Sequence, residues 1–171
     1  MTPESVGPLS RPVSIERLPA EGLDVSVDTT PEERAALARD FKLPAINALT
    51  GRYCLTGTPE RIRVEGTVSA NIRQICVVTL EPFDSDFEEA VEVDFASMAD
   101  ETGSTDDAQP VEDRPDEIVG GRIDLGALTA EFLALGLDPY PRKPGVDFSF
   151  ESDDEDTPSP FAALKTLKPD D

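Results

Sequence analysis

The chain contains no histidine, the residue that enzymes use most often as a general base and as a metal ligand. This absence excludes every Ser-His and Cys-His nucleophile pair. The only two cysteines, Cys54 and Cys76, cannot by themselves supply the four ligands of an ordinary structural zinc site. The chain also lacks a phosphate-cradling glycine motif and a dinucleotide-binding fingerprint. We therefore expect a protein that is not an enzyme and that takes no cofactor and no small-molecule substrate.

Long apolar stretches are absent as well. No run reaches the length of about 18 apolar residues that predicts a membrane span. The first residues do not combine a basic region with an apolar run, so they do not indicate a secretory signal. We expect a cytoplasmic protein without membrane contact, in which both cysteines stay reduced.

Basic residues are few, with 15 lysines and arginines against 36 acids and a net charge of −21. Residues 97–121 hold eight acids and one base, and residues 147–171 hold eight acids and two bases. Their net charges of −7 and −6 supply 13 of the 21 excess negative charges. Such charge disfavours a broad phosphate-binding surface and favours basic partners such as ribosomal proteins. A solvated acidic surface without a partner explains the charge equally well.

The clearest pattern lies in residues 62–95. Apolar side chains alternate with polar ones over 62–72, which is the period of a strand with one buried face. The apolar run 75–78 predicts a strand covered on both faces, and 81–86 has the composition of a turn. A second alternating run ends at Phe95, so the sequence predicts a β-hairpin.

Two helices are expected to pack on this hairpin. Thr30 and Glu33 have the spacing of a capping box, which predicts a helix over 31–42. Asp124 can cap a second helix over 124–137. Residues 45–55 fit either a short helical turn or a strand. The predicted fold is α+β, a mainly antiparallel sheet, open or curled toward a small barrel, with two or three packed helices.

The same reasoning divides the chain into five segments. These are a loose N-terminus at 1–11, a β-rich core with one helix at 12–96, an acidic flexible linker at 97–121, a helix and Pro-rich segment that completes the core at 122–146, and an acidic tail with a short terminal helix at 147–171.

Residues 76–83, Cys-Val-Val-Thr-Leu-Glu-Pro-Phe, resemble the signature of the large ribosomal RNA subunit accumulation protein family, called YceD. Residues 121–128 and 138–145 resemble segments that follow in the alphaproteobacterial branch of that family, and the resemblance spans roughly 10–168. It implies a non-catalytic ribosome-biogenesis factor that supports accumulation of large-subunit rRNA. The expected partners are an rRNA precursor, a basic ribosomal protein or both. The alternative is an acidic protein-interaction adaptor that does not act on RNA.

The candidate signature residues in this first segment are Cys76, Thr79, Glu81, Pro82 and Phe83. Many family members resemble Cys-x-x-Cys here, which implies a metal or redox pair. In this chain Arg73 stands where the first cysteine would be, so we interpret Cys76 as a small buried apolar residue in a strand.

Three further groups are candidates for binding. Tyr140, Arg142 and Lys143 could contact RNA by stacking and phosphate pairing, unless they form an ordinary loop whose tyrosine packs on the core. The apolar triplet Phe161, Leu164 and Leu167 could dock in a partner's groove or fold back on its own sheet. A last group, Arg61, Arg63 and Arg73, shares one face of the first hairpin strand. We expect it to pair across the sheet with Glu88, Glu92 and Asp94 rather than to form a free basic stripe.

Overall fold

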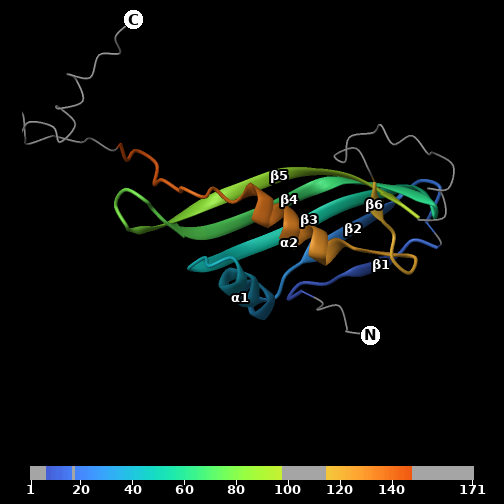
Figure 1. Ribbon diagram of the computed structural model, residues 1–171, viewed down its shortest axis with the longest axis horizontal. Helices are drawn as coiled ribbons and strands as arrows, with labels where there is room; N and C mark the ends of the chain where they lie inside the picture. The colour runs from blue at the N-terminus through green and yellow to red at the C-terminus, as the bar shows by residue number, and fades with distance from the viewer. Residues whose placement is uncertain (1–6, 17, 98–114, 148–171) are drawn as a thin grey trace, which may run out of the picture.

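A computed structural model describes residues 7–16, 18–97 and 115–147. The elements are β1 (Pro12–Ser14), β2 (Leu23–Asp28), α1 (Pro31–Asp40), β3 (Ala45–Thr58), β4 (Arg61–Ile75), β5 (Pro82–Ala96), β6 (Asp116–Glu117), β7 (Arg122–Asp124) and α2 (Leu125–Gly136). Five strands form one sheet in the order β2-β3-β4-β5-β6, while β1 and β7 pair separately (Figure 1). All pairs are antiparallel except the short pair of β5 and β6. The predicted α+β class is confirmed.

β4 and β5 form the predicted hairpin, but its turn lies earlier than expected. The alternating apolar residues of β4 are buried, as predicted: Ile62, Val64, Val68, Ala70 and Ile72. However, β4 ends at Ile75 and β5 begins at Pro82, so the connection is 76–81 rather than 81–86. The prediction of a strand covered on both faces at 75–78 is wrong, because Ile75 and Val77 are 42% and 43% exposed.

Residues 45–55, whose sequence fitted either a short helical turn or a strand, belong to β3. This strand pairs with β2 on one side and with β4 on the other. Two glycines, Gly51 in β3 and Gly66 in β4, make room for the buried ring of Tyr53. A Cβ atom on Gly51 would lie 2.6 Å from Tyr53 Cε2, and one on Gly66 would lie 2.7 Å from Tyr53 Cδ1. The small residues therefore allow an aromatic ring to fill the centre of the sheet's inner face.

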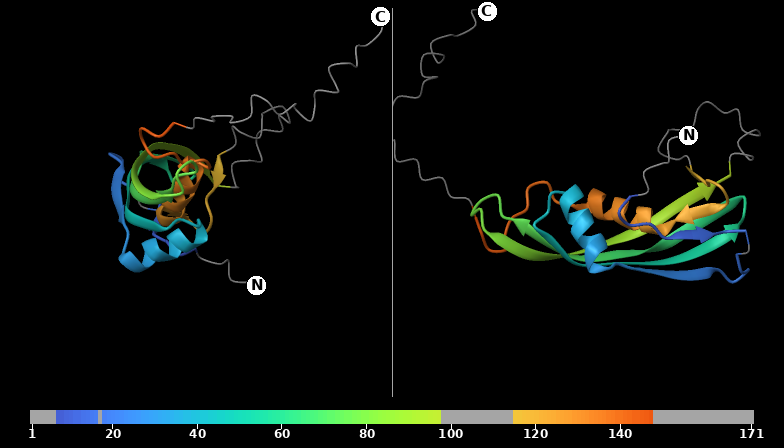
Figure 2. Two further views of the ribbon diagram at one scale, coloured as in Figure 1. Left: turned by 90° about the vertical axis from the view of Figure 1, so that its left-hand side faces the viewer. Right: turned by 90° about the horizontal axis from the view of Figure 1, so that it is seen from below.

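The sheet curls around α2, which lies along its inner face (Figure 2). Asp124 caps this helix as predicted, since its Oδ1 accepts hydrogen bonds from Gly126 N at 2.9 Å and Ala127 N at 3.1 Å. Leu125, Leu128 and Leu133 are buried against the sheet. Among the described strands β2 and β6 are separate edges, so the sheet curls in the direction of a barrel, as predicted, but does not close into one. The helix fills the interior that a closing sheet would need for its own side chains.

α1 begins with the predicted capping box, in which Glu33 N donates to Thr30 Oγ1 and Thr30 N donates to the Glu33 carboxylate. The described residues contain two α-helices. The predicted terminal helix, with Phe161, Leu164 and Leu167, lies outside the described residues. No helix in the described ranges has both the length and the apolar character needed to cross a membrane.

Several described residues fall within segments that were predicted to be loose. Leu9, in the predicted loose N-terminus, is 1% exposed. Within the predicted acidic linker, β6 pairs with the end of β5, and the next residue, Ile118, is buried. The rest of this linker, at 98–114, and the tail from 148 onward lie outside the described residues.

Candidate functional site at the hairpin tip

The two segments of the sequence that carry most of the resemblance meet at the tip of the hairpin. The loop 76–81 contacts the segment 138–145, which follows α2 and runs toward the hairpin tip (Figure 1). Val77 N donates a hydrogen bond to Pro141 O at 2.9 Å. Lys143 N donates to Cys76 Sγ at 3.4 Å, and Lys143 Nζ lies 3.1 Å from Glu81 Oε2. Backbone and side-chain bonds therefore fix the two segments to each other.

Cys76 is the buried centre of this junction. Its side chain is 0% exposed, and its Sγ accepts hydrogen bonds from Lys143 N and, at 3.5 Å, from Thr79 N. The N–H of Lys143 contributes most to lowering the pKa of the Cys76 thiol to about 6, followed by Thr79, while burial acts in the opposite direction. Cys76 is buried as predicted, but the rest of the prediction is wrong. It lies in a loop rather than a strand, and it acts as a hydrogen-bond acceptor rather than an inert apolar residue.

Leu80 has an unusual backbone conformation in the same loop. Its φ is 58°, in the left-handed region that costs an L-residue roughly 1–2 kcal/mol. Hydrogen bonds from Leu80 N to Cys76 O and from Cys76 N to Glu81 O, both 2.9 Å, close the loop around it. The leucine side chain is nevertheless 75% exposed, so it contributes little to the core. A strained backbone that holds a large apolar side chain in water is typical of a contact site.

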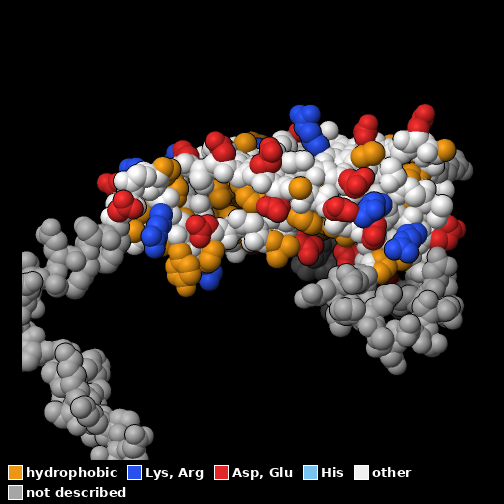
Figure 3. Space-filling model, turned by 90° about the horizontal axis from the view of Figure 1, so that it is seen from above, with side chains coloured by type: hydrophobic (Ala, Val, Ile, Leu, Met, Phe, Trp, Pro, Cys, Tyr) orange, Lys and Arg blue, Asp and Glu red, His pale blue; other side chains and the backbone are white. Residues whose placement is uncertain are grey.

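We define the tip surface as the exposed side chains of the two joined segments and the adjoining strand end: Ile75, Val77, Leu80, Tyr140, Arg142 and Lys143. Four of the six large apolar side chains that are exposed in the described chain belong to it. Tyr140 is 72% exposed, so the alternative in which it packs on the core is wrong. In Figure 3, apolar side chains protrude beside Lys and Arg side chains at this end of the molecule. The described structure thus joins an aromatic ring, apolar groups and cations on one small surface.

The arginines of β4 are neutralised by β5. Arg63 pairs with Glu92 and lies 3.6 Å from Asp94, and Arg61 lies 3.9 Å from Asp94. Cross-strand pairing of these two arginines, rather than a free basic stripe, is confirmed.

Arg73 also pairs across the sheet, but with Asp84, at 2.7 Å and 2.8 Å, and not with the predicted acids. Glu88 lies opposite Ser69 instead of an arginine. In contrast, Arg142 makes no ion pair with any described residue. Arg142, exposed at the tip, therefore has its guanidinium available to a partner, as do several exposed cations elsewhere on the described chain.

The remaining candidate residues of the tip are placed by its hydrogen bonds and by the start of β5. Across 7–16, 18–97 and 115–147, no three Cys, Asp or Glu side chains lie close enough to hold a metal ion. Arg73, which stands in place of a first cysteine, is engaged with Asp84. The candidates Glu81, Thr79 and Lys143 take part in the hydrogen bonds of the junction, whereas Pro82 and Phe83 begin β5.

Sequence reasoning missed Ile75, Val77 and Leu80 as parts of the tip surface. Apolar residues in a strand pattern are assigned to the core, and nothing in the local sequence marks the left-handed φ of Leu80. Three prolines at 139–144 were the one available signal, because they predict an extended segment that could lie against another element.

Comparison with known proteins gives one match. A family model described as large ribosomal RNA subunit accumulation protein YceD matches residues 64–168. The match begins inside β4 and includes both segments of the hairpin tip. It starts later than the resemblance noted from the sequence, so β1, β2, α1 and β3 precede it. No curated protein and no solved structure matches the chain.

Proposed function

This chain belongs to the YceD family of large ribosomal RNA subunit accumulation proteins, and we propose that it supports this accumulation as a binding factor that catalyses no reaction. The observation that carries the proposal is the tip surface. Two segments about sixty positions apart in the chain are joined there by the Val77–Pro141 and Lys143–Cys76 hydrogen bonds. Their junction presents exposed side chains to a partner.

The composition of the tip surface suits a component of the assembling large subunit. Tyr140 offers a ring on which an unpaired base or an apolar side chain can stack, and Arg142 offers a planar set of donors for a phosphate or a carboxylate. Tyrosine and arginine are also enriched among the residues that dominate protein interfaces. The partner at this surface is an rRNA precursor or a basic ribosomal protein. RNA contact would be confined to the tip, because the net charge of −21 repels phosphates elsewhere.

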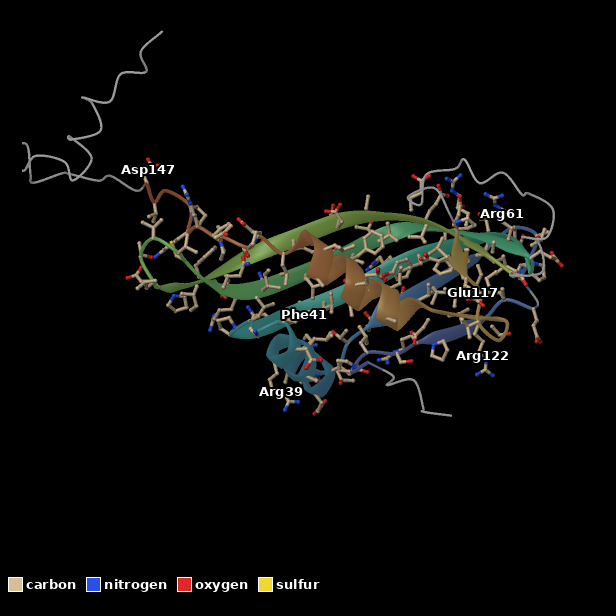
Figure 4. All side chains as sticks on the ribbon, viewed as in Figure 1. Arg39, Phe41, Arg61, Glu117, Arg122 and Asp147 are labelled. Carbon is tan, nitrogen blue, oxygen red and sulfur yellow. The ribbon has the colours of Figure 1, made fainter. Side chains whose placement is uncertain are left out.

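Depletion and rescue test the proposal. We expect cells depleted of the protein to show a lower ratio of large-subunit to small-subunit rRNA, and wild-type protein to restore it. A Tyr140→Ala, Arg142→Glu double variant should fail to restore the ratio. Arg39→Glu is the matched control, because Arg39 is an exposed arginine on α1, outside the tip surface (Figure 4).

Three results would count against the proposal. A ratio that is unchanged on depletion contradicts the function itself. Full rescue by the double variant means that the contact does not lie at the tip. Partner binding that survives nuclease, needs Phe161 and has no effect on rRNA favours the adaptor function instead.

A further inference from the structure

Within the described chain, β5 is an open edge of the sheet along most of its length. Its neighbour on the side away from β4 is β6, which pairs only with Phe95 and Ala96. From Pro82 to Asp94, no strand of the described chain pairs with that side. Figure 4 shows Glu117 of β6 at the end of the sheet that is far from Asp147 and the hairpin tip. The edge between the tip and β6 therefore offers unpaired backbone groups to another strand.

The register shows which residues face this edge. Ile118 N donates to Ala96 O at 2.9 Å, so the backbone groups of Ala96 point away from β4. Ser97 N donates to Glu60 O at 2.8 Å, so the following residue points toward β4. Directions alternate along a strand, and the register of β4 and β5 is continuous. The N–H and C=O groups at the open edge therefore belong to the even-numbered residues Asp84, Asp86, Glu88, Ala90, Glu92 and Asp94.

Five of these six residues are acidic, and β5 contains no basic residue. The arginines of β4 neutralise Asp84, Glu92 and Asp94, but Asp86 and Glu88 have no cationic partner within the described chain. Asp86 accepts a hydrogen bond from Asn71 Nδ2 at 2.7 Å. Acidic side chains are spread along this side of the molecule in Figure 3.

The outer face of the sheet is hollowed beside Asp86 and Glu88. The hollow is lined by small side chains of β3 and β4, among them Ala48, Thr50 and Ser69. A long side chain that reaches across β5 from a neighbouring strand has room there, with carboxylates at its end. The backbone edge and the charges thus favour the same kind of occupant.

We propose that the open edge of β5 binds an extended protein segment with lysine or arginine at every second residue, which adds as a strand beside Asp84–Asp94. This inference rests on the proposed function and names its partner class, a basic protein of the large ribosomal subunit. The backbone bonds give affinity, and the matched two-residue period of acids and bases gives register and specificity.

Other occupants fit the edge less well. The acidic strand β6 pairs with β5 only at Phe95 and Ala96. The chain's own stretches at 98–114 and 147–171 have net charges of −5 and −6, so charge disfavours either of them beside the acidic residues of β5. Pairing β5 with β5 of a second copy would place acids beside acids, which destabilises a sheet. RNA lacks the strand backbone that the edge can pair with.

Ala90→Pro tests the edge with little change of charge or volume. Ala90 is exposed, and its N–H faces the open side, so proline removes an outward donor while the bonds to β4 from the odd-numbered neighbours remain. An Asp86→Asn, Glu88→Gln double variant tests the charges without altering the backbone. Its matched control is Glu21→Gln with Asp40→Asn, which removes two exposed acids elsewhere.

The probe is a synthetic peptide of about ten residues in which lysine and threonine alternate, compared with an isomer that has all its lysines in one block. Titration of the full-length protein should show the alternating peptide binding about tenfold more tightly than the block isomer. Ala90→Pro should weaken binding of the alternating peptide about tenfold, and the Asp86→Asn, Glu88→Gln variant should weaken it about fivefold. The matched control should bind this peptide as tightly as wild type does. The bound peptide should slow hydrogen exchange at the amides of Glu88, Ala90 and Glu92.

Equal binding of the two peptides overturns the proposal. So does unchanged binding by an Ala90→Pro protein that keeps the wild-type unfolding midpoint. If Ala90→Pro lowers the unfolding midpoint, the Asp86→Asn, Glu88→Gln variant provides the test instead. Peptide binding by this variant that equals binding by its Glu21→Gln, Asp40→Asn control overturns the proposal. A wild-type dimer that Ala90→Pro dissociates also overturns the proposal, in favour of a second copy of the chain at the edge. RNA that slows exchange of the same amides overturns it in favour of RNA. An rRNA ratio unaffected by depletion would contradict the proposed function alone, since the peptide titration does not depend on it.

Discussion

The backbone N–H of Lys143 donates a hydrogen bond to Cys76 Sγ at 3.4 Å, and the two residues lie 67 positions apart. This bond joins the loop between β4 and β5 to the segment that follows α2. It also favours the thiolate, because a sulfur that accepts N–H groups is stabilised when it carries negative charge. The ionisation of one buried thiol is therefore coupled to the assembly of the tip surface.

Cys76→Ser should reveal this coupling in the pH dependence of stability. The folded pKa of about 6 lies below the usual thiol pKa of about 8.5 in an unfolded chain. The stabilisation by the thiolate is complete above the unfolded pKa and is lost as pH falls through the folded one. We expect the difference in unfolding free energy between wild type and Cys76→Ser to grow from about pH 6 to about pH 9 in urea titrations under reducing conditions.

Cys54→Ser is the control for that measurement. A hydrogen bond with Asp24, followed by burial, raises the pKa of the Cys54 thiol, so its contribution runs in the opposite direction. The difference between wild type and Cys54→Ser should not grow with pH. Parallel stability curves for wild type and Cys76→Ser would contradict the coupling.

Leu80→Gly should stabilise the fold and impair function. Glycine adopts the φ of 58° without strain, so we expect the unfolding free energy to rise by up to about 1 kcal/mol. Loss of the exposed leucine should weaken rescue of the rRNA ratio. Lys42→Gly is the matched control, because Lys42 has a φ of 57° just after the end of α1. It should stabilise the fold and still restore the rRNA ratio in full. Full rescue of the rRNA ratio by Leu80→Gly would show that the Leu80 side chain does not contribute to the contact at the tip.

Tyr53→Phe should weaken the attachment of α2 to the sheet. Thr129 Oγ1 donates to Leu125 O at 2.6 Å, so Tyr53 Oη is the donor in its 2.7 Å bond with Thr129 Oγ1. Removing this buried hydroxyl should cost about 1 kcal/mol of unfolding free energy, measured by urea titration. Tyr140→Phe, at an exposed site, should cost nothing measurable. Equal stability of wild type and Tyr53→Phe would show that the bond adds no net stability.

Glycine to alanine changes in α2 should destabilise the protein, although alanine favours an exposed helix by about 1 kcal/mol. A Cβ atom on Gly136 would lie 2.0 Å from Phe87 Cε2, and one on Gly126 would lie 2.7 Å from Arg11 N. We expect Gly136→Ala to lower the unfolding free energy by about 1–3 kcal/mol and Gly126→Ala to lower it by more. The Phe87 side chain that meets Gly136 can move more easily than the Arg11 backbone that meets Gly126.

A double variant separates packing from helix propensity at Gly136. Adding Phe87→Leu to Gly136→Ala should recover part of the loss, since the smaller side chain vacates the space that the new Cβ needs. Strictly additive costs for the two changes would contradict a steric origin of the effect.

Local patterns in the sequence were enough to predict the strand alternation of β4, the capping box at Thr30 and the cap at Asp124. These features depend on residues within a few positions of one another, and their physics is local. The length of β3 was not predictable in the same way. It depends on two neighbouring strands and on glycines that accommodate Tyr53, and one of them, Gly66, lies in β4.

The sequence by itself determined the composition of this protein, the acidity of β5, the absence of histidine and the family resemblance. Only the tertiary structure decided that Cys76 lies in a loop, that its sulfur accepts the Lys143 N–H, and that residues 76–81 and 138–145 share one surface. The same holds for the open side of β5, whose facing residues follow from the register with β4 and β6. These relationships join residues far apart in the chain, and their formation depends on long-range packing that local periodicity does not encode.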